Sequence, residues 1–120
     1  MPRGRIMRLP LWQVSPPASD NDAACIQAEA ALAAAAARGA SVLVLPEIWL
    51  PGYNQPGFAA RALSLDTPPL LRLAAAAKAQ ATALVTGYAE RDGDLIYNSA
   101  ACFGPDGALL LNYRKVQLYG

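Results

Sequence analysis

The sequence predicts an α/β fold with a mixed sheet, and two features indicate it. A short apolar run, Ser41 to Leu45, directly follows an alanine-rich segment of helical composition. Two longer runs, Ala83 to Glu90 and Leu95 to Phe103, flank the turn residues Asp92 and Gly93. Early strands that alternate with helices favour parallel pairing, whereas later strands joined by tight turns pair as antiparallel neighbours.

The first expected strand runs from Ile6 to Val14, because this stretch is rich in Ile, Leu, Trp and Val. Pro10 is a defect within it, since proline removes one hydrogen-bond donor from the ladder. Residues 1–6 belong either to this first segment or to an extension that precedes a true start at Met7.

An alanine-rich helix is expected next, ending at Arg38 with Gly39 as its C-cap. Residues 19–22 supply several N-cap candidates and negative charge at the helix N-terminus. Alanine gives high helix propensity but little amphipathic pattern, so the inward face is weakly defined. We expect Ile26 and Leu32 to point inward.

The run Ser41 to Leu45 is typical of a strand that is covered on both faces, and Pro46 ends it. Prolines and glycines between Ile48 and Gly57 indicate a loop. A turn or two of helix is expected within Phe58 to Leu65. The alternation of strand and helix then continues.

A second full helix is expected from Thr67, as N-cap, to about Ala81, because Pro68 suits the first helical turn. The hairpin of two strands follows. The turn Gly104 to Gly107 then leads into a last strand, Ala108 to Tyr113.

Composition excludes several classes of protein. The 120 residues carry 10 Lys+Arg and 9 Asp+Glu, a net charge of +1 without a basic run, so neither nucleic acid nor an anionic membrane is an expected partner. The length fits one compact unit. The most apolar stretch, Ala28 to Ala37, is too short to span a bilayer and contains Glu29. Pro10 and Gln13 interrupt any apolar signal-peptide region.

The absence of histidine restricts the available chemistry. With no histidine in the chain, proton transfer would have to use carboxylate, amine, phenol or thiol groups. The two cysteines, Cys25 and Cys102, form no CxxC motif and are too few for a disulfide framework. This cysteine usage predicts a reducing compartment, and so a cytoplasmic protein.

Two charged residues at strand ends are candidates for chemistry. Glu47 follows a buried strand, and partial desolvation there is expected to raise its pKa toward that of a general base. Lys115 follows the last strand and has the point charge that suits an oxyanion. Position alone favours the simpler alternatives, which are a solvated loop glutamate and a basic pair that faces water.

Three further residues are assigned to structure rather than chemistry. Neither Cys25 nor Cys102 has a base or cation nearby in sequence, so both are expected to be packing residues. Asn98 is a polar residue within an apolar strand, and we expect it to satisfy backbone groups of a neighbouring loop.

Five motifs in order resemble the nitrilase superfamily, the carbon-nitrogen hydrolases. They are VLVLPE at 42–47 with PGY at 51–53, VTGYAER at 85–91, LIYNSAA at 95–101, GPDG at 104–107 and YRKVQL at 113–118. The resemblance extends from about Met7 to the last residue. It implies that residues 1–120 form the N-terminal half of an α-β-β-α sandwich domain.

The resemblance also implies functional roles. In that family a Glu-Lys-Cys triad hydrolyses amides, nitriles or carbamoyl compounds without a cofactor or metal. Glu47 matches the general base, Lys115 the oxyanion-stabilising lysine, and Tyr53 a substrate-binding residue. The family's nucleophilic cysteine follows the lysine by some thirty residues or more, and neither Cys25 nor Cys102 matches it. This chain therefore supplies no nucleophile.

The function that follows is hydrolysis of a small non-peptide amide by a longer parent protein, while the chain alone is expected to be inactive. Family members commonly form homo-oligomers, and we expect the parent to do so. Three alternatives stay open: a nitrile- or carbamoyl-hydrolysing member, a truncated or degenerate form without activity, and an unrelated small α/β binding domain.

Overall fold

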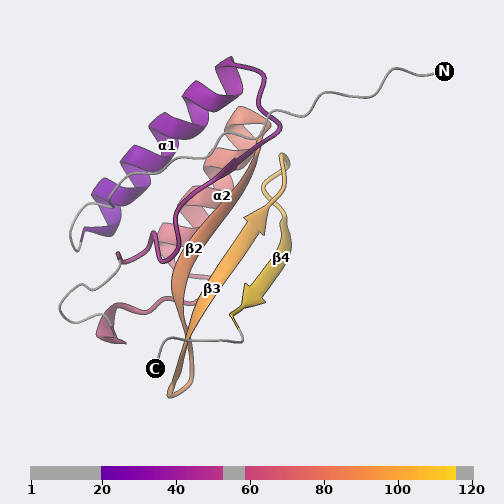
Figure 1. The fold of residues 1–120 in the computed structure, drawn as a ribbon. Helices are drawn as coiled ribbons and strands as arrows, with labels where there is room; N and C mark the ends of the chain where they lie inside the picture. The colour runs from indigo at the N-terminus through magenta and orange to yellow at the C-terminus, as the bar shows by residue number, and fades with distance from the viewer. Residues whose placement is uncertain (1–19, 53–58, 116–120) are drawn as a thin grey trace.

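The computed structural model describes residues 20–52 and 59–115. In chain order its elements are α1 (Asn21–Ala37), β1 (Val42–Val44), a 3-10 turn η1 (Ala59–Arg61), α2 (Pro68–Gln80), β2 (Ala83–Asp92), β3 (Leu95–Phe103) and β4 (Leu109–Arg114) (Figure 1). The strand expected at 6–14 and Tyr53 lie outside the described residues. The other expected helices and strands are present in the predicted order.

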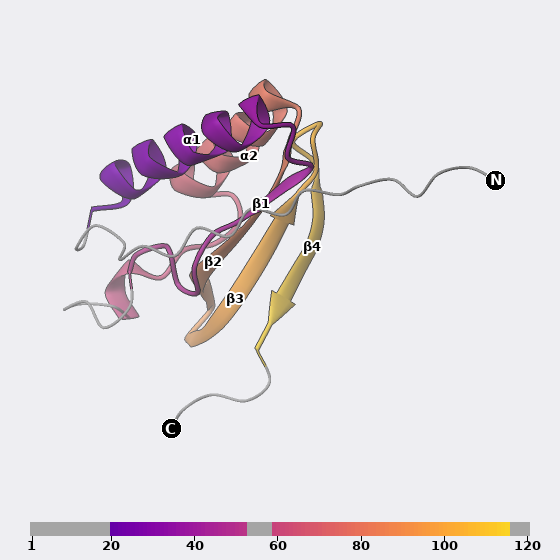
Figure 2. The same cartoon turned by 45° about the horizontal axis from the view of Figure 1, so that its top comes forward.

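The sheet is mixed, as predicted. Its strand order is β1-β2-β3-β4, with β1 and β2 parallel and the two remaining pairs antiparallel. Asp92 pairs with Leu95, so the hairpin turn consists of Gly93 and Asp94, one residue later than expected. Gly93 has a φ of 60°, a conformation that glycine adopts without strain. Both helices cover the same face of the sheet (Figure 2).

Helix α1 begins as predicted but turns a different face inward. Asp20 is the N-cap, and its Oδ1 accepts hydrogen bonds from the backbone N–H groups of residues 22 and 23 at 3.0 and 3.2 Å. Leu32 is buried, but Ile26 is 54% exposed, so that prediction is wrong. The inward face is Ala24, Cys25, Ala28, Leu32 and Ala35. These positions recur at helical spacing, and Ile26 lies on the other side of the helix.

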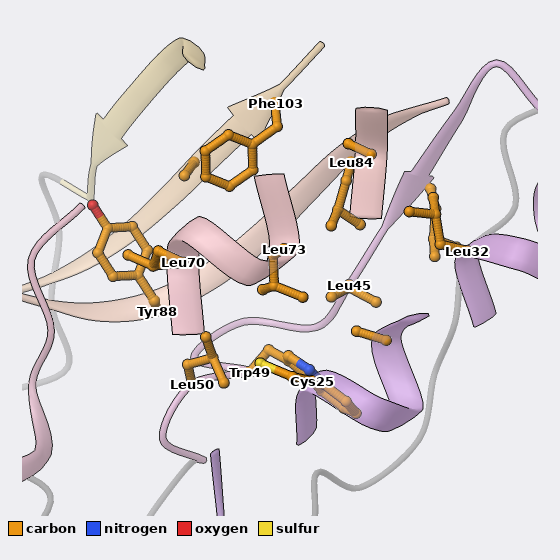
Figure 3. Close-up of a cluster of buried hydrophobic side chains, with 14 of the residues drawn as sticks. Cys25, Leu32, Leu45, Trp49, Leu50, Leu70, Leu73, Leu84, Tyr88 and Phe103 are labelled. Atoms are coloured by element: carbon orange, nitrogen blue, oxygen red, sulfur yellow. The ribbon is translucent and has the colours of Figure 1, made fainter. Parts of the chain in front are cut away.

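The core lies between the helices and the sheet (Figure 3). Leucines from both helices and from β1 and β2 meet there with Tyr88 and Phe103. Trp49, which belongs to the segment expected as a loop, is fully buried, and its Nε1–H donates to the Ala24 carbonyl at 3.1 Å. This contact helps to anchor the segment after β1 to helix α1.

The opposite face of the sheet is different. Leu111 and Tyr113 pair with Cys102 and Ala100 on that face and are 60% and 54% exposed. The sheet therefore has one face packed under helices and one open face with apolar side chains. In the described part of the chain, neither helix is long and apolar enough to cross a membrane.

Candidate active site

Glu47 lies where the chain leaves β1 and crosses the open face of β2 at Gly87. A Cβ atom on Gly87 would lie 2.5 Å from the Ile48 nitrogen and 2.7 Å from the Pro46 oxygen. Only glycine permits that approach, because real Cβ contacts are not so short. Ile48 adopts a φ of 46°, which turns the chain sharply just after Glu47. The position of Glu47 therefore depends on a glycine forty residues later in the chain.

Lys115 reaches the same place on the open face from the opposite edge of the described sheet. It follows β4, and its backbone N–H donates to the Asn98 carbonyl at 2.8 Å. Its Nζ lies 3.0 Å from Oε1 of Glu47. The two residues named from the sequence, 68 positions apart, thus form an ion pair.

Asn98 is the third member of this group, although its sequence context predicted a structural role elsewhere. Its Nδ2 donates to the same Glu47 Oε1 at 2.5 Å. The expectation that Asn98 would serve backbone groups of a loop is therefore wrong for its side chain. A signal was present in the sequence, because a polar side chain within an apolar strand must find a partner.

The electrostatics of Glu47 also differ from the expectation. Its side chain is 48% exposed, and that of Lys115 is 36% exposed. Hydrogen bonds from Lys115 and then from Asn98 lower the pKa of Glu47 and outweigh the opposing effect of burial. The predicted upward shift is wrong, because donors decide the pKa here rather than desolvation. Glu47 is thus a carboxylate at neutral pH.

A cavity of about 300 Å³ opens beside this pair on the face away from the helices. Glu47, Asn98 and Lys115 supply its charged and amide groups, and Gly87 and Ala100 contribute small residues to its lining. The remaining lining is largely apolar, with Val44, Leu45, Val85, Ser99 and Tyr113. Such a site suits a small molecule with one polar group.

Neither cysteine is among the described residues that line the cavity. Cys25 is buried in α1, and burial raises the pKa of its thiol to about 11. Cys102 lies within β3 and is partly buried. Among the described residues, no three His, Cys, Asp or Glu side chains are placed to hold a metal ion.

A carboxylate and an amine thus line a small cavity on a mixed sheet that carries helices on its other face. The carbon-nitrogen hydrolase family model matches residues 8–119, and the chain belongs to that family. The predicted α/β fold class is confirmed, since amidases are among the solved structures that match this chain.

Particular relatives include both amidases and nitrilases. The chain is 33% identical to the chloroplastic ω-amidase of Arabidopsis thaliana over 84% of its own length and 29% of that protein. It is 32% identical to an aliphatic nitrilase of Rhodococcus rhodochrous over 88% of its length and 31% of that protein. The chain therefore spans about 30% of the length of these relatives.

The fold matches that of the amidase from Nesterenkonia sp. AN1, solved in complex with acrylamide. The TM-score is 0.87 at 29% identity, over all of this chain and 47% of the amidase chain. A structure of a point mutant of that amidase shows covalent addition of the acetamide moiety of fluoroacetamide at the active-site cysteine.

Proposed function

We propose that these residues supply the general base and the oxyanion-stabilising cation of a thiol hydrolase that acts on small non-peptide amides. The observation that carries the proposal is the 3.0 Å contact between Lys115 Nζ and Glu47 Oε1 at the edge of a cavity. In this proposal residues 1–120 are the N-terminal part of a longer domain, and the nucleophilic thiol comes from outside them. Covalent addition at the cysteine of the Nesterenkonia amidase supports a thiol nucleophile.

The first half of the reaction follows from the charges. Glu47, ionised at neutral pH, accepts the thiol proton while the sulfur attacks the amide carbon. The carbonyl π electrons move to oxygen, and the Lys115 ammonium stabilises the oxyanion that forms. When the tetrahedral intermediate collapses, the C–N bond breaks, Glu47 returns its proton to the departing nitrogen, and a thioester remains.

The second half reverses these roles. Water attacks the thioester carbon while Glu47 takes one of its protons, and Lys115 again faces the developing oxyanion. Collapse releases the acid and the thiolate, which regains the proton. One water is consumed, and the products are a carboxylic acid and ammonia or an amine.

The size of the cavity and its apolar lining favour a short aliphatic amide, and the amidase relatives support the same substrate class. The aliphatic nitrilase relative supports a second candidate, hydrolysis of a small nitrile by the same groups. We further propose that the whole protein is a cytoplasmic homo-oligomer. The free Cys25 and Cys102 agree with a reducing compartment.

The test is ammonia release from short aliphatic amides, ω-amides and the matching nitriles by the full-length protein. Glu47→Gln and Lys115→Ala should each lower kcat/KM by about 100-fold or more. Glu29→Gln on helix α1 is the control and should retain activity. Near-normal turnover by either site variant would refute the roles assigned here.

The non-catalytic alternative has its own test. The gene is sequenced downstream of the codon for Gly120. An open frame with a further cysteine supports the hydrolase, whereas a stop codon at that point supports a truncated protein without activity. Turnover by residues 1–120 alone would show that the nucleophile lies within them.

A further inference from the structure

A buried carboxylate that the proposed reaction does not use lies on the helix side of the sheet. Glu90 is on β2, and its side chain is 9% exposed. Its Oε1 accepts hydrogen bonds from Ser99 Oγ at 2.8 Å, Asn112 Nδ2 at 3.1 Å and Arg114 Nε at 3.0 Å. Its Oε2 accepts one from Arg114 Nη2 at 3.2 Å. Arg114 thus grips Glu90 with two nitrogens.

The Arg114 guanidinium is held from three directions. Besides Glu90, it donates to Asp92 Oδ2 at 3.0 Å and lies 4.0 Å above the centre of the Tyr97 ring. A planar guanidinium fixed by a fork of hydrogen bonds and a ring face has little rotational freedom left. The main-chain position of Arg114 is restricted in turn.

Arg114 is the last residue of β4, and Lys115 is the next residue. Successive side chains of a strand point to opposite faces of the sheet, so Arg114 and Lys115 point to opposite faces. Arg114 joins Glu90 on the helix side, whereas Lys115 lines the cavity on the open face. Any shift of Arg114 would move Lys115 with it.

Strand β4 has few other attachments. Within the described chain it has one neighbour, β3, and three of its leucines are exposed. Its polar residues supply the remaining anchors, since Asn112 donates to Glu90 and accepts from the Tyr88 hydroxyl at 2.7 Å. The hydrogen bond from the Lys115 N–H to the Asn98 carbonyl continues the pairing of β4 with β3 by one residue.

We infer that Glu90 is a positioning residue: acting through Arg114, it fixes the end of β4 and so holds Lys115 at its 3.0 Å contact with Glu47. The expected loss of kcat rests on the proposed function, whereas the expected displacement of Lys115 does not. Because the Lys115 hydrogen bond lowers the pKa of Glu47, that pKa reports the contact without any turnover.

The experiment compares Glu90→Gln with Glu29→Gln in the full-length protein. Glu29 is the matched control, because it binds the Arg72 guanidinium with both oxygens at 2.6 and 3.1 Å between the two helices. The pKa of Glu47 is measured by carboxyl ¹³C NMR titration, with its signal assigned by its loss in Glu47→Gln. Activity is measured in parallel and normalised to the folded fraction.

Glu90→Gln is expected to raise the pKa of Glu47 toward its ordinary value and to lower kcat by about 10- to 100-fold with little change in KM. Glu29→Gln should change neither. If Glu90→Gln does not fold, Arg114→Lys, which keeps the charge but loses the fork, should give the same two effects.

The outcomes separate the two proposals. An unchanged Glu47 pKa and kcat in a folded Glu90 or Arg114 variant would overturn the positioning role. A shifted pKa in a protein that hydrolyses no amide or nitrile would support the positioning role while the proposed function failed.

Discussion

The two faces of the sheet hold their carboxylates in opposite ways. On the helix side, Glu90 receives four hydrogen bonds from the described residues and is 9% exposed. On the open side, Glu47 receives two from the same part of the chain that the structure describes, both on Oε1, and is 48% exposed. The cations come from consecutive residues, Arg114 and Lys115. A saturated carboxylate fixes geometry, whereas one with spare acceptor capacity beside a cavity can exchange a proton.

The pKa of each carboxyl reflects this difference. Burial is the largest single effect on Glu90 and opposes its ionisation, but hydrogen bonds from Arg114, Ser99 and Asn112 together outweigh it and lower its pKa. For Glu47 the hydrogen bond from Lys115 is the largest effect. The ionised form of Glu90 therefore depends on a set of partners, and that of Glu47 mainly on one.

The largest effect should come from Gly87→Ala. It tests whether the position of Glu47 on the open face depends on the close contact between its backbone and Gly87. The added methyl would meet the backbone of residues 46–48 and displace Glu47. Activity of the full-length protein should fall by about 100-fold, and stability by about 1 to 3 kcal/mol from overpacking. Gly39→Ala is the control. Nothing lies within 4 Å of an added Cβ there, so the alanine is strained only by the backbone φ of 76°. Equal activity in both variants would contradict the prediction.

Glu90→Gln and Glu47→Gln should separate stability from activity. Removing the buried charge should lower the free energy of unfolding by about 2 kcal/mol, while Glu47→Gln changes it by about 0.5 kcal/mol, the usual value for an exposed pair. Urea denaturation of the two variants measures the difference. A larger stability loss from Glu47→Gln would reverse the roles of the two faces.

Acid should remove the Glu90 contribution. Because its folded pKa is lowered, its stabilisation is complete above the unfolded pKa of about 4.3 and is lost as pH falls through the folded value. The stability gap between wild type and Glu90→Gln should therefore be largest near neutral pH and shrink below about pH 4. Denaturation midpoints across pH 3 to 7 in steps of about one unit measure it. A gap that widens in acid would show that the Glu90 pKa is raised instead.

Asn98→Ala should have a smaller effect on the open face. It removes the second donor to Glu47, so the pKa of Glu47 should rise, but by less than when Lys115 is removed. NMR titration of Lys115→Ala and Asn98→Ala ranks the two donors. Asn112→Ala, on the helix side, is the matched amide control and should affect the Glu47 pKa less than Asn98→Ala does.

The smallest expected effect is that of salt. Raising ionic strength to about 1 M shortens the screening length to about 3 Å, which should weaken the exposed Lys115 contact and raise the Glu47 pKa by a few tenths of a unit. The Glu90 pKa should move less, because its partners enclose it. Equal salt sensitivity at both carboxyls would remove the distinction between the faces.

The elements were predictable because each has a local cause. Pro68 at the start of α2 and Gly93 in the hairpin act through their own backbone conformations, and Asp20 caps α1 by bonding backbone N–H groups two and three residues later. Ile26 was misplaced because an alanine-rich helix has almost no apolar pattern to orient it. Trp49 was missed as a core residue because prolines and glycines nearby indicated a loop.

The sequence by itself determined the order of helices, strands and turns, and it named Glu47 and Lys115 as candidates. Only the tertiary structure decided that Asn98 joins them, that Gly87 admits the Glu47 backbone, and that Glu90 binds Arg114 on the helix side of the sheet. Turns and caps depend on neighbours along the chain. A pKa or a contact depends on atoms brought together through space, here by strand pairing and by the close passage of residues 46–48 over Gly87.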